Sequence, residues 1–567
     1  MSSSGSGTKV SLSQEEYYDL GTFQRPIHTK SNDAGSWFNR GLTWSYAFNH
    51  EEAAHCFEQA ITHDASCSMA YWGLAYCLGP NYNKPWDTFD KAELDSILTR
   101  GHRAAEQAHA LATTAVEKAL AQALRFRYPQ RQAEDAKACA PWNKEYADAM
   151  RGVYENFPSD LDVAALFADA LVNITPWALW DIRTGLPAEG AQTLEAKAVL
   201  DRALVLEGGN EHPGLLHLYI HLMEMSTTPE IAMPAADHLR GLIPDAGHLN
   251  HMPTHLDILC GDYRRAIASN TEAIRADERF LARAGALNFY SLYRSHNYHF
   301  RIYAAMFAGQ SKVAINTIAQ LEAFLPEELL KIESPPMADW LEGFISMRVH
   351  ASIRFGRWQD ILSMNLPQDA KLYCVTTAMI HYAKGVAFAA TGRLREAEVA
   401  KSRFVDALKQ VAPTRMLFNN TCVEILAIAK EMLDGELEYR RGNIDLAFKH
   451  LLKAIALDDD LPYDEPWGWM QPTRHAYGAL LLEQDHVEKA LRVYSADLGF
   501  DDTLPRALQH PNNVWALHGY HECCVKLGKT AEARIIRQQL RMATAIADVP
   551  VKSSCFCRLS VEDKVTV

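Results

Sequence analysis

The chain has 567 residues, of which 48% are hydrophobic and 22% are charged, and its formal net charge is −14. A chain of this length is too long for one compact core, unless it is built of repeats that stack along one axis. An acidic chain without a basic run is not expected to bind nucleic acid or anionic lipid. No apolar stretch approaches the roughly 18 residues that span a bilayer, and the polar start MSSSGSGTKV has no signal-peptide core, so we expect a cytoplasmic protein without a membrane partner.

We expect a flexible N-terminal tail over residues 1–30 and the first helix pair directly after it. The segment WFNRGLTWSYAFNHEEAAHCFEQAI spaces large, small and aromatic residues as two packed helices require. These residues are Trp37, Gly41, Trp44, Ala53, Phe57 and Ala60.

Two segments farther along carry polar residues whose role stays open. The loop GPNYN is explained as a turn by its Gly-Pro pair, yet Asn81 and Asn83 can also offer amides to a ligand. In DVAALFADALVNITPW, Asp169 and Asn173 share a helix face, which favours a buried hydrogen-bonded pair. Asn173 and the nearby Trp177 remain candidates for substrate contact.

Histidines concentrate between residues 212 and 299, in HPGLLHLYIHLME, DAGHLNHMPTHL and HNYHF. Spacings of three and four residues place each set on one face of a helix. The sets are His217, His221 and Glu224; His248, His251 and His255; and His296 and His299. Three helices are thus expected to carry one histidine stripe each.

A short turn recurs in this region and after it, as GDYRRA, GRLREA, GNIDLA and GKTAEA. Each places glycine where one helix ends in left-handed backbone and a small residue where the next helix packs. The alternation and hairpin turns of a β-sheet protein are absent. We therefore predict an all-α, right-handed helical-repeat solenoid over residues 31–548, with a C-terminal tail over residues 549–567.

Two features lie near the C-terminus. The aromatic and acidic segment YDEPWGW, residues 463–469, can close over the inner surface of such a solenoid or simply cap it. Cys555 and Cys557 lack the two-residue spacer of zinc knuckles and redox motifs, so we favour a mobile tail over a metal or redox role.

The histidine motifs and the repeat pattern together resemble the tetratricopeptide-repeat (TPR) family of bacteria and fungi that carries a histidine signature inside its repeats. The resemblance covers most of residues 35–545, including AYWGLAYCLGPNYNKPW and the histidine stretches above. It implies a TPR solenoid and a metal site, without a settled reaction. The leucines after Gly214 depart from the pattern, where a smaller residue is expected.

The resemblance also implies that positions 2, 5, 9 and 12 of each first helix line the concave groove. When Ala266 and Ala314 are taken as position 20, all eight residues of the three stripes fall at these groove positions. These are His217, His221, Glu224, His248, His251, His255, His296 and His299. We expect all eight to point into one groove, while His350, His475 and His518 continue the pattern more thinly.

Eight clustered titratable side chains are costly to bury and repel one another when protonated, and a bound cation removes both costs. Imidazole suits copper, iron, zinc and nickel, and such a set can hold one or two ions, copper first and iron or zinc next. Positions 5 and 9 are central in a helix. The predicted direct metal ligands are therefore His217, His221, His251, His255 and His299.

The remaining residues receive catalytic or substrate roles. Glu224, His248 and His296 are candidates for acid-base or supporting work, and the two histidines are next in line as ligands. His212, ahead of a proline, is either a helix cap or a substrate contact. The predicted substrate-binding set is His212, Asn81, Asn83, Asn173, Trp177 and Asn297.

We expect a metal-dependent enzyme that acts on a small organic molecule, and an imidazole-rich site favours copper- or iron-dependent oxidation. A zinc-dependent hydrolase or hydratase is the second hypothesis. The third is a non-enzymatic TPR scaffold that binds a peptide or protein partner, the usual task of this repeat. A homodimer stays open in each case.

Overall fold

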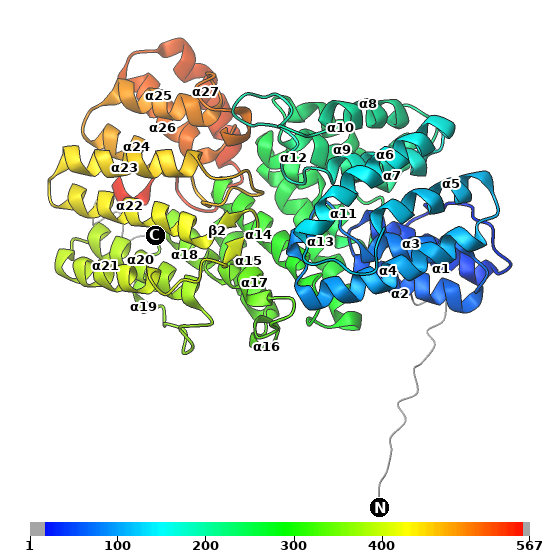
Figure 1. Cartoon of the computed structure of the whole chain (residues 1–567). Helices are drawn as coiled ribbons and strands as arrows, with labels where there is room; N and C mark the ends of the chain where they lie inside the picture. The colour runs from blue at the N-terminus through cyan, green and yellow to red at the C-terminus, as the bar shows by residue number, and fades with distance from the viewer. Residues whose placement is uncertain (1–16, 559–567) are drawn as a thin grey trace, which may run out of the picture.

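The structure is a computed structural model that describes residues 17–558. It is an all-α, TPR-like repeat solenoid, as predicted, and the strands of the described range form one short hairpin. Figure 1 shows the helices packed in successive layers along the chain. No helix within residues 17–558 combines the length and apolar character needed to cross a membrane.

The first half of the fold contains helices α1 (Asn32–Tyr46), α2 (His50–His63), α3 (Ser68–Leu78), α4 (Lys91–Leu111), α5 (Ala115–Leu124), α6 (Ala140–Asn156), α7 (Leu161–Val172), α8 (Thr193–Leu204), α9 (Pro213–Glu224), α10 (Met233–Leu239), α11 (Gly247–His251), α12 (Pro253–Leu259), α13 (Tyr263–Ala284) and α14 (Ser291–Phe307).

The second half contains α15 (Ser311–Phe324), α16 (Glu327–Leu330), α17 (Met337–Ile345), α18 (Met347–Arg354), α19 (Trp358–Ser363), α20 (Cys374–Ala390), α21 (Leu394–Leu408), the hairpin strands β1 (Met416–Leu417) and β2 (Asn420–Thr421), α22 (Cys422–Arg440), α23 (Ile444–Asp459), α24 (Thr473–Glu483), α25 (Val487–Leu498), α26 (Val514–Lys526) and α27 (Thr530–Thr544). The two strands are antiparallel, with Met416 opposite Thr421.

Local sequence explains where many helices begin and end. Asp160 accepts the backbone N–H of Val163 at the start of α7, and Thr421 and Glu424 form a reciprocal capping box at the start of α22. The predicted turn glycines all adopt left-handed backbone, with φ of 76°, 79°, 85° and 68° at Gly261, Gly392, Gly442 and Gly528. The small residues that follow them, Ala266, Ala397, Ala447 and Ala533, are buried.

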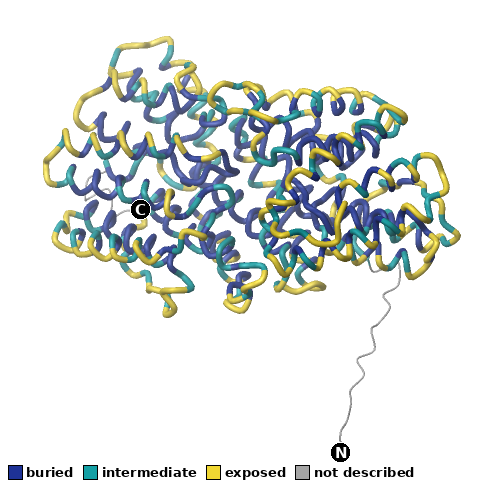
Figure 2. Tube along the Cα trace, in the orientation of Figure 1, coloured by how far each residue is buried: buried dark blue, intermediate teal, exposed yellow. Residues whose placement is uncertain are grey.

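Two large hydrophobic cores divide the solenoid. The first draws residues from Leu20 to Tyr293 and the second from Met225 to Phe556. In Figure 1 they correspond to the blue-to-cyan lobe and the yellow-to-red lobe, with green helices between them. Figure 2 shows the buried segments running through the middle of the molecule and the exposed ones at the outer turns. Helices α12 and α14 contribute side chains to both cores, so the histidine stripes lie where the lobes meet.

Residues 17–30, expected as part of a flexible tail, pack against the first lobe. Tyr17 donates a hydrogen bond to Glu52 (2.6 Å), and the buried Arg25 bridges Asp160 and Asp162, each at 2.7 Å. These contacts hold the segment because the arginine supplies several donors to two acids at once. Residues 1–16 of the predicted tail lie outside the described residues.

Candidate metal centre

Helix α9 directs His217 and His221 toward the interior. Its start is fixed by Pro213, whose missing N–H costs nothing in a first turn, and by His212, whose Nδ1 accepts a backbone N–H (3.2 Å). A Cβ on Gly214 would lie 2.6 Å from the Tyr46 ring, so glycine allows the close approach of that residue. The Tyr46 carbonyl thereby accepts a hydrogen bond from His217 Nδ1 at 2.6 Å.

The second stripe lies on two short helices instead of the predicted one. Pro253 has no N–H to continue the helical ladder, so α11 ends at His251 and α12 begins at the proline. Met252 keeps helical dihedral angles (φ −49°, ψ −40°), and the backbone therefore keeps turning. His251 and His255 still share a face, with their Nε2 atoms 2.8 Å apart.

The third stripe splits. Successive residues of an α-helix are about 100° apart, so His296 and His299 on α14 diverge by about 60°. His296 faces His251, with ring centroids 4.5 Å apart. His299 faces the second lobe instead, where its Nε2 lies 2.8 Å from Sδ of Met470 and its ring lies 5.2 Å from that of Phe344. His299 therefore does not lie beside the other predicted ligands, and His296 lies there instead.

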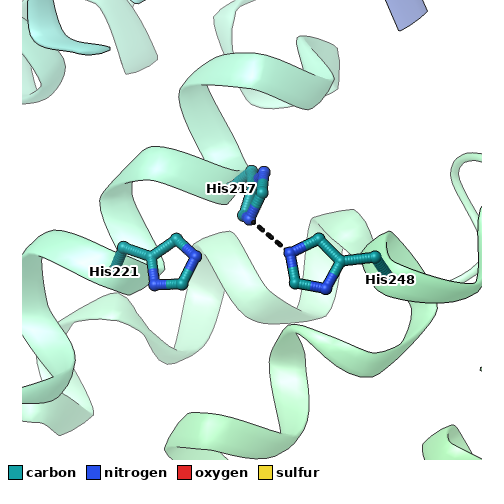
Figure 3. Close-up of side chains that lie close together, drawn as sticks. All are labelled: His217, His221 and His248. Carbon is teal, nitrogen blue, oxygen red and sulfur yellow. Dashed lines mark hydrogen bonds between the residues drawn. The ribbon is translucent and has the colours of Figure 1, made fainter. Parts of the chain in front are cut away.

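Six histidines form two adjoining groups of three, and within each group one possible ligand atom per residue lies within 4.8 Å of the others. The first group is His217, His221 and His248 (Figure 3), and the second is His251, His255 and His296. Ring centroids are 5.7 Å apart between His221 and His255 and 5.9 Å apart between His248 and His251. We call these six residues the histidine cluster. His248, ranked below the direct ligands from sequence, belongs to it fully.

The hydrogen bonds of the cluster fix where the ring protons lie. Four Nδ1 atoms face oxygen acceptors: His217 faces the Tyr46 carbonyl, His251 faces Asn270 Oδ1 (2.7 Å), and His221 and His255 face Glu224 (3.0 and 2.6 Å). In the neutral rings of His217 and His251, Nδ1 thus carries the proton and Nε2 carries a lone pair. The Nε2 lone pair of His251 faces Nε2 of His255, and Nε2 of His221 has no hydrogen-bond partner among the described residues.

Two carboxylates are buried against the cluster. Glu224 is 0% exposed and Glu465 is 2% exposed, and both contact Nδ1 of His255. Within residues 17–558, neither forms an ion pair with lysine or arginine. Burial, and then the neighbouring Glu465, raises the pKa of Glu224 well above its ordinary value. Glu465 belongs to the segment 463–469, which closes over the cluster, one of its two predicted roles.

Burial also keeps the imidazoles neutral. It lowers the pKa of His217 to about 3, and burial followed by the neighbouring histidines lowers the pKa of His221 and His248 well below the ordinary value. The same holds for His251 and His296. Neutral imidazole is the form that coordinates a metal ion. Five of the six histidines of the cluster, all except His255, are thus neutral nitrogen donors beside two acids.

Three aromatic residues with left-handed backbone surround the cluster. Phe48, Trp177 and Phe418 have φ of 54°, 58° and 49°, a conformation that costs bulky residues roughly 1–3 kcal/mol each. Their rings lie 4.4 Å from His217, 6.0 Å from His221 and 4.6 Å from His296, respectively. Backbone strain is therefore concentrated at the residues that enclose the histidines.

A cavity of about 600 Å³ opens beside the cluster, between the two lobes. Its lining includes His296 and Glu465 from the cluster's edge, together with Trp177, Phe418 and Asn83. A small molecule in this cavity reaches two residues that also contact the histidines. Trp177 and Asn83, predicted as substrate-binding residues, thus border a space of suitable size.

The other predicted substrate residues have structural partners. Asn173 donates to Asp169 at 2.9 Å, the buried pair that the spacing favours. Asn297 donates to Asp277 Oδ2 (2.7 Å), on the side of α14 away from the cluster. Asn81 accepts the N–H groups of residues 83 and 84 and so closes its own turn. His212, besides capping α9, lies 3.1 Å from Asp162.

Several neighbours of the cluster have no signal in the sequence. Phe48 precedes a helix cap and Met470 lies in the loop before α24, and neither belongs to a periodic stripe. Asn270 lies one turn after the small residue of α13, and its Nδ2 donates to the Ala266 carbonyl (2.9 Å), which orients its Oδ1 toward His251. Only Glu465 lay in a segment that composition had marked.

A second group of buried histidines lies in the C-terminal lobe. His475 Nδ1 accepts from Arg354 (3.1 Å), and its Nε2 donates to Asp497 (2.8 Å). The same carboxylate accepts from His510 (2.9 Å) and from Asn513 (3.0 Å). We call these residues the aspartate-centred cluster. Its ring nitrogens meet groups of the opposite hydrogen-bonding type, in contrast to those of His251 and His255.

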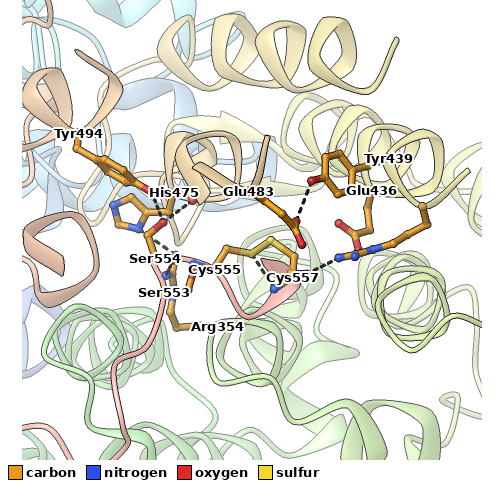
Figure 4. Close-up of a disulfide and its surroundings, with 11 residues drawn as sticks. Arg354, Glu436, Tyr439, His475, Glu483, Tyr494, Ser553, Ser554, Cys555 and Cys557 are labelled. Carbon is orange, nitrogen blue, oxygen red and sulfur yellow. Dashed lines mark hydrogen bonds and ion pairs between the residues drawn. A yellow bond between two sulfur atoms is a disulfide. The ribbon is translucent and has the colours of Figure 1, made fainter. Parts of the chain in front are cut away.

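The described part of the C-terminal tail packs beside this second cluster (Figure 4). Ser554 donates to the carbonyl of His475 (2.8 Å) and lies 2.6 Å from the Tyr494 hydroxyl. Cys555 and Cys557 form a disulfide, so these two cysteines are paired to each other. The expectation of a mobile tail therefore does not hold for residues 549–558, and residues 559–567 lie outside the described range.

Comparisons with known proteins agree with a helical fold and go no further. No family model and no curated protein sequence matches the chain. Among solved structures, it is similar to the Cut9–Hcn1 hetero-tetramer of APC/C (14% identity, TM-score 0.28, 90% of this chain and 87% of that one covered) and to an IFIT1 monomeric mutant with Gppp-AAAA (12%, 0.33, 88% and 97%). A third is Naa15/Naa10 bound to HypK-THB (12%, 0.20, 94% and 73%). At these scores, the fold rests on the chain's own helix pairs and turns.

Proposed function

We propose that the histidine cluster binds one or two transition-metal ions, copper first and iron or zinc next. The proposal is carried by two adjoining groups of three buried histidines, in which Nε2 of His251 and Nε2 of His255 face each other at 2.8 Å. A cation between such donors replaces repulsion by coordination, and it also balances the buried charge of Glu224 and Glu465. The resemblance to the histidine-signature TPR family supports the same assignment.

The surrounding residues would act on the ligands. Metal-binding histidines usually donate their other N–H to a carbonyl or carboxylate, which fixes the tautomer and aims the free nitrogen. Tyr46, Asn270 and Glu224 occupy these places here. Six imidazoles exceed the four ligands of a tetrahedral ion, so two ions with three histidines each fit the set better than one.

We further propose that the centre performs a copper- or iron-dependent oxidation of a small organic molecule held in the adjoining cavity. An imidazole-rich set suits ions that change oxidation state, and the bound ion would supply electron transfer. The chain supplies the enclosure: Phe48 stacks on His221 (5.8 Å) and Phe300 on His255 (4.9 Å), which excludes water from both groups. Glu224 and Glu465 place carboxyl oxygens next to the ligands.

A zinc-dependent hydrolase or hydratase is the second candidate. One observation favours it: His221, Glu224 and His255 also lie within 4.8 Å of one another through one ligand atom each. Two histidines and one glutamate are a ligand set of hydrolytic zinc sites and match the donor types of non-haem iron sites as well.

A scaffold that binds a peptide or protein partner is the third candidate and follows from the TPR-like architecture alone. In this chain the inner faces of α9, α12 and α14 are occupied by histidines that are 0–6% exposed. The segment 463–469 covers them, so a peptide would have to bind another face of the solenoid.

Elemental analysis of the untagged full-length protein tests the metal proposal. Protein expressed with copper, iron and zinc in the medium should retain one or two transition-metal ions per chain after gel filtration. Oxygen consumption with a panel of aromatic and amine reductants then separates oxidation from hydrolysis, because a zinc protein consumes none. Protein that carries less than a tenth of an equivalent of any transition metal, and takes up none on titration, would leave the scaffold as the leading function.

A further inference from the structure

The cavity between the lobes has an unusual lining. Its ring-bearing residues are Phe89, Trp177, Phe289, Tyr293, Trp340 and Phe418. Trp177, Phe289, Trp340 and Phe418 are only half-buried, so parts of their rings remain free to contact a bound molecule. Trp177 and Phe418 are held there by left-handed backbone, which places strain at the walls of this space.

The charges of the lining all have one sign. Asp87, Asp90, Asp339 and Glu465 border the cavity, and no lysine or arginine does. Asp339 is paired with Arg415 (3.2 Å) and Glu465 contacts His255, whereas Asp87 and Asp90 form no ion pair among the described residues. Lys84, outside the lining, pairs with Glu93 (2.5 Å), and its Nζ lies 4.5 Å from the Phe89 ring and 4.1 Å from the Phe289 ring. The rings left for a bound cation are therefore those of Trp177, Trp340 and Phe418.

The inner end of the cavity is polar, and it contains a buried nitrogen atom without a hydrogen-bond partner among the described residues. His296 lines it, is 6% exposed, and its Nδ1 has no hydrogen-bond partner among residues 17–558. Buried polar atoms normally have a partner, in the protein or in a ligand. This atom lies at the end of the space nearest to the histidine cluster.

We propose that this cavity binds an organic cation, an amine whose ammonium group is attached to an aromatic or similarly apolar body. Ring faces attract cations through their quadrupole, and unpaired carboxylates supply the opposite charge, whereas a carboxylic acid would meet like charges on all sides. A volume of about 600 Å³ accommodates a small metabolite with room to spare. The inference rests on the proposed function only where it names this amine as the substrate of the centre.

Three indole compounds whose side chains end in groups of different charge test whether the cavity prefers a cation. Tryptamine is cationic, tryptophol is neutral and indole-3-propionate is anionic at neutral pH. Isothermal titration of the full-length protein should give a Kd for tryptamine roughly tenfold or more below that of tryptophol, with no measurable binding of the propionate. Equal affinity for all three, or preference for the anion, would overturn the proposal.

Two variants place the binding in this cavity. Trp340→Leu keeps an apolar side chain and removes the ring, so tryptamine affinity should fall roughly two- to tenfold, by more than the affinity for tryptophol. Asp87→Asn should reduce the preference for the cation roughly two- to fivefold. Asp502→Asn changes an exposed acid outside the cavity lining and should leave all three affinities unchanged. Unaltered tryptamine binding in both Trp340→Leu and Asp87→Asn would show that the amine binds elsewhere.

The metal content of the same preparations separates this inference from the proposed function. Selective tryptamine binding by protein that holds no metal would support the cation site and contradict the proposed metal centre. Protein that holds metal but does not prefer the amine supports the metal centre and removes the cation site.

Discussion

Two groups of buried histidines in one solenoid have opposite surroundings. In the aspartate-centred cluster, His475 and His510 donate to Asp497, and Arg354 donates back to His475. In the histidine cluster, Nε2 of His251 faces Nε2 of His255, and three residues with left-handed backbone pack against the neighbouring rings. The first arrangement is complete as it stands, whereas the second has donors directed at a common space. Burial of a histidine alone therefore says little about its role, and the partners of both ring nitrogens decide it.

The largest expected effect is on metal content. The double variant His251→Ala/His255→Ala removes two of three imidazoles from one group, so bound metal should fall by one ion per chain, as measured by plasma mass spectrometry. His518→Ala, at a half-buried histidine outside both clusters, should keep the full content. Equal metal loss in the control would mean that the comparison between the two clusters has no chemical basis.

The next effect is on stability and concerns the other cluster. Asp497→Ala leaves His475, His510 and Arg354 without their shared acceptor, and loss of one partner in a buried charged group costs about 3–5 kcal/mol. Urea unfolding should show this loss while metal content stays unchanged. The exposed Asp502→Ala is the matched control and should change the free energy of unfolding by less than about 0.5 kcal/mol.

Low pH should reduce the difference in unfolding free energy between wild type and Asp497→Ala. Burial alone would raise the pKa of Asp497, but His475 and His510 outweigh it and hold the pKa far below its ordinary value of 3.8. An acid with a lowered pKa in the folded state contributes stability that is complete above the unfolded pKa and declines as pH falls through the folded one. Wild type and Asp497→Ala should therefore differ fully at pH 7, and the difference should begin to shrink below about pH 4. A constant difference down to pH 2 would contradict this assignment.

A smaller effect is expected one step away from the metal ligands. Asn270→Ala removes the acceptor that fixes the proton of His251 on Nδ1, and loss of such a partner typically lowers metal affinity about 10–100-fold. Competition with a chromogenic chelator measures the change. Thr271→Ala, the next residue on α13, bonds only to the Ile267 carbonyl and should leave the affinity unaltered.

The smallest expected effect is on the stability of the metal-free protein, and it distinguishes the histidine cluster from the aspartate-centred cluster. His251→Ala should lower the free energy of unfolding of the metal-free protein by only about 1 kcal/mol, a few degrees in Tm for a long chain. Leu249 and Leu256 are fully buried and anchor α11 and α12 independently of the ring, and the substitution removes one of two facing acceptors. A loss as large as that of Asp497→Ala would identify the histidine cluster as a structural element.

Much of this architecture could be predicted because it depends on short-range pattern. Glycines in left-handed turns followed by small residues recur at each helix pair, and i, i+4 spacing holds for His217 and His221 on α9. The same spacing survived the break at Pro253, because the residue before the proline remains helical. These features are encoded within a few residues of one another.

The errors concern direction and distant contacts. The repeat register predicts His299 as a ligand ahead of His296. Two side chains three residues apart on a helix point about 60° apart, however, and this angle directs His299 toward the second lobe. Glu465 reaches His255 from a loop far along the chain, and Phe48 reaches His217 from before α2. No periodicity encodes such contacts, since they depend on how the two lobes meet.

The position of Glu465 in the chain also affects how the proposed centre would be assembled in the cell. All six histidines of the cluster are synthesised before it, and the last of them, His296, precedes it by about 170 residues. At about 5–20 residues per second, the ribosome leaves the ligands uncovered for roughly 10–30 s before the covering segment exists. If the cluster binds metal as proposed, an ion would therefore reach the histidines more easily during translation than after Glu465 has packed against His255.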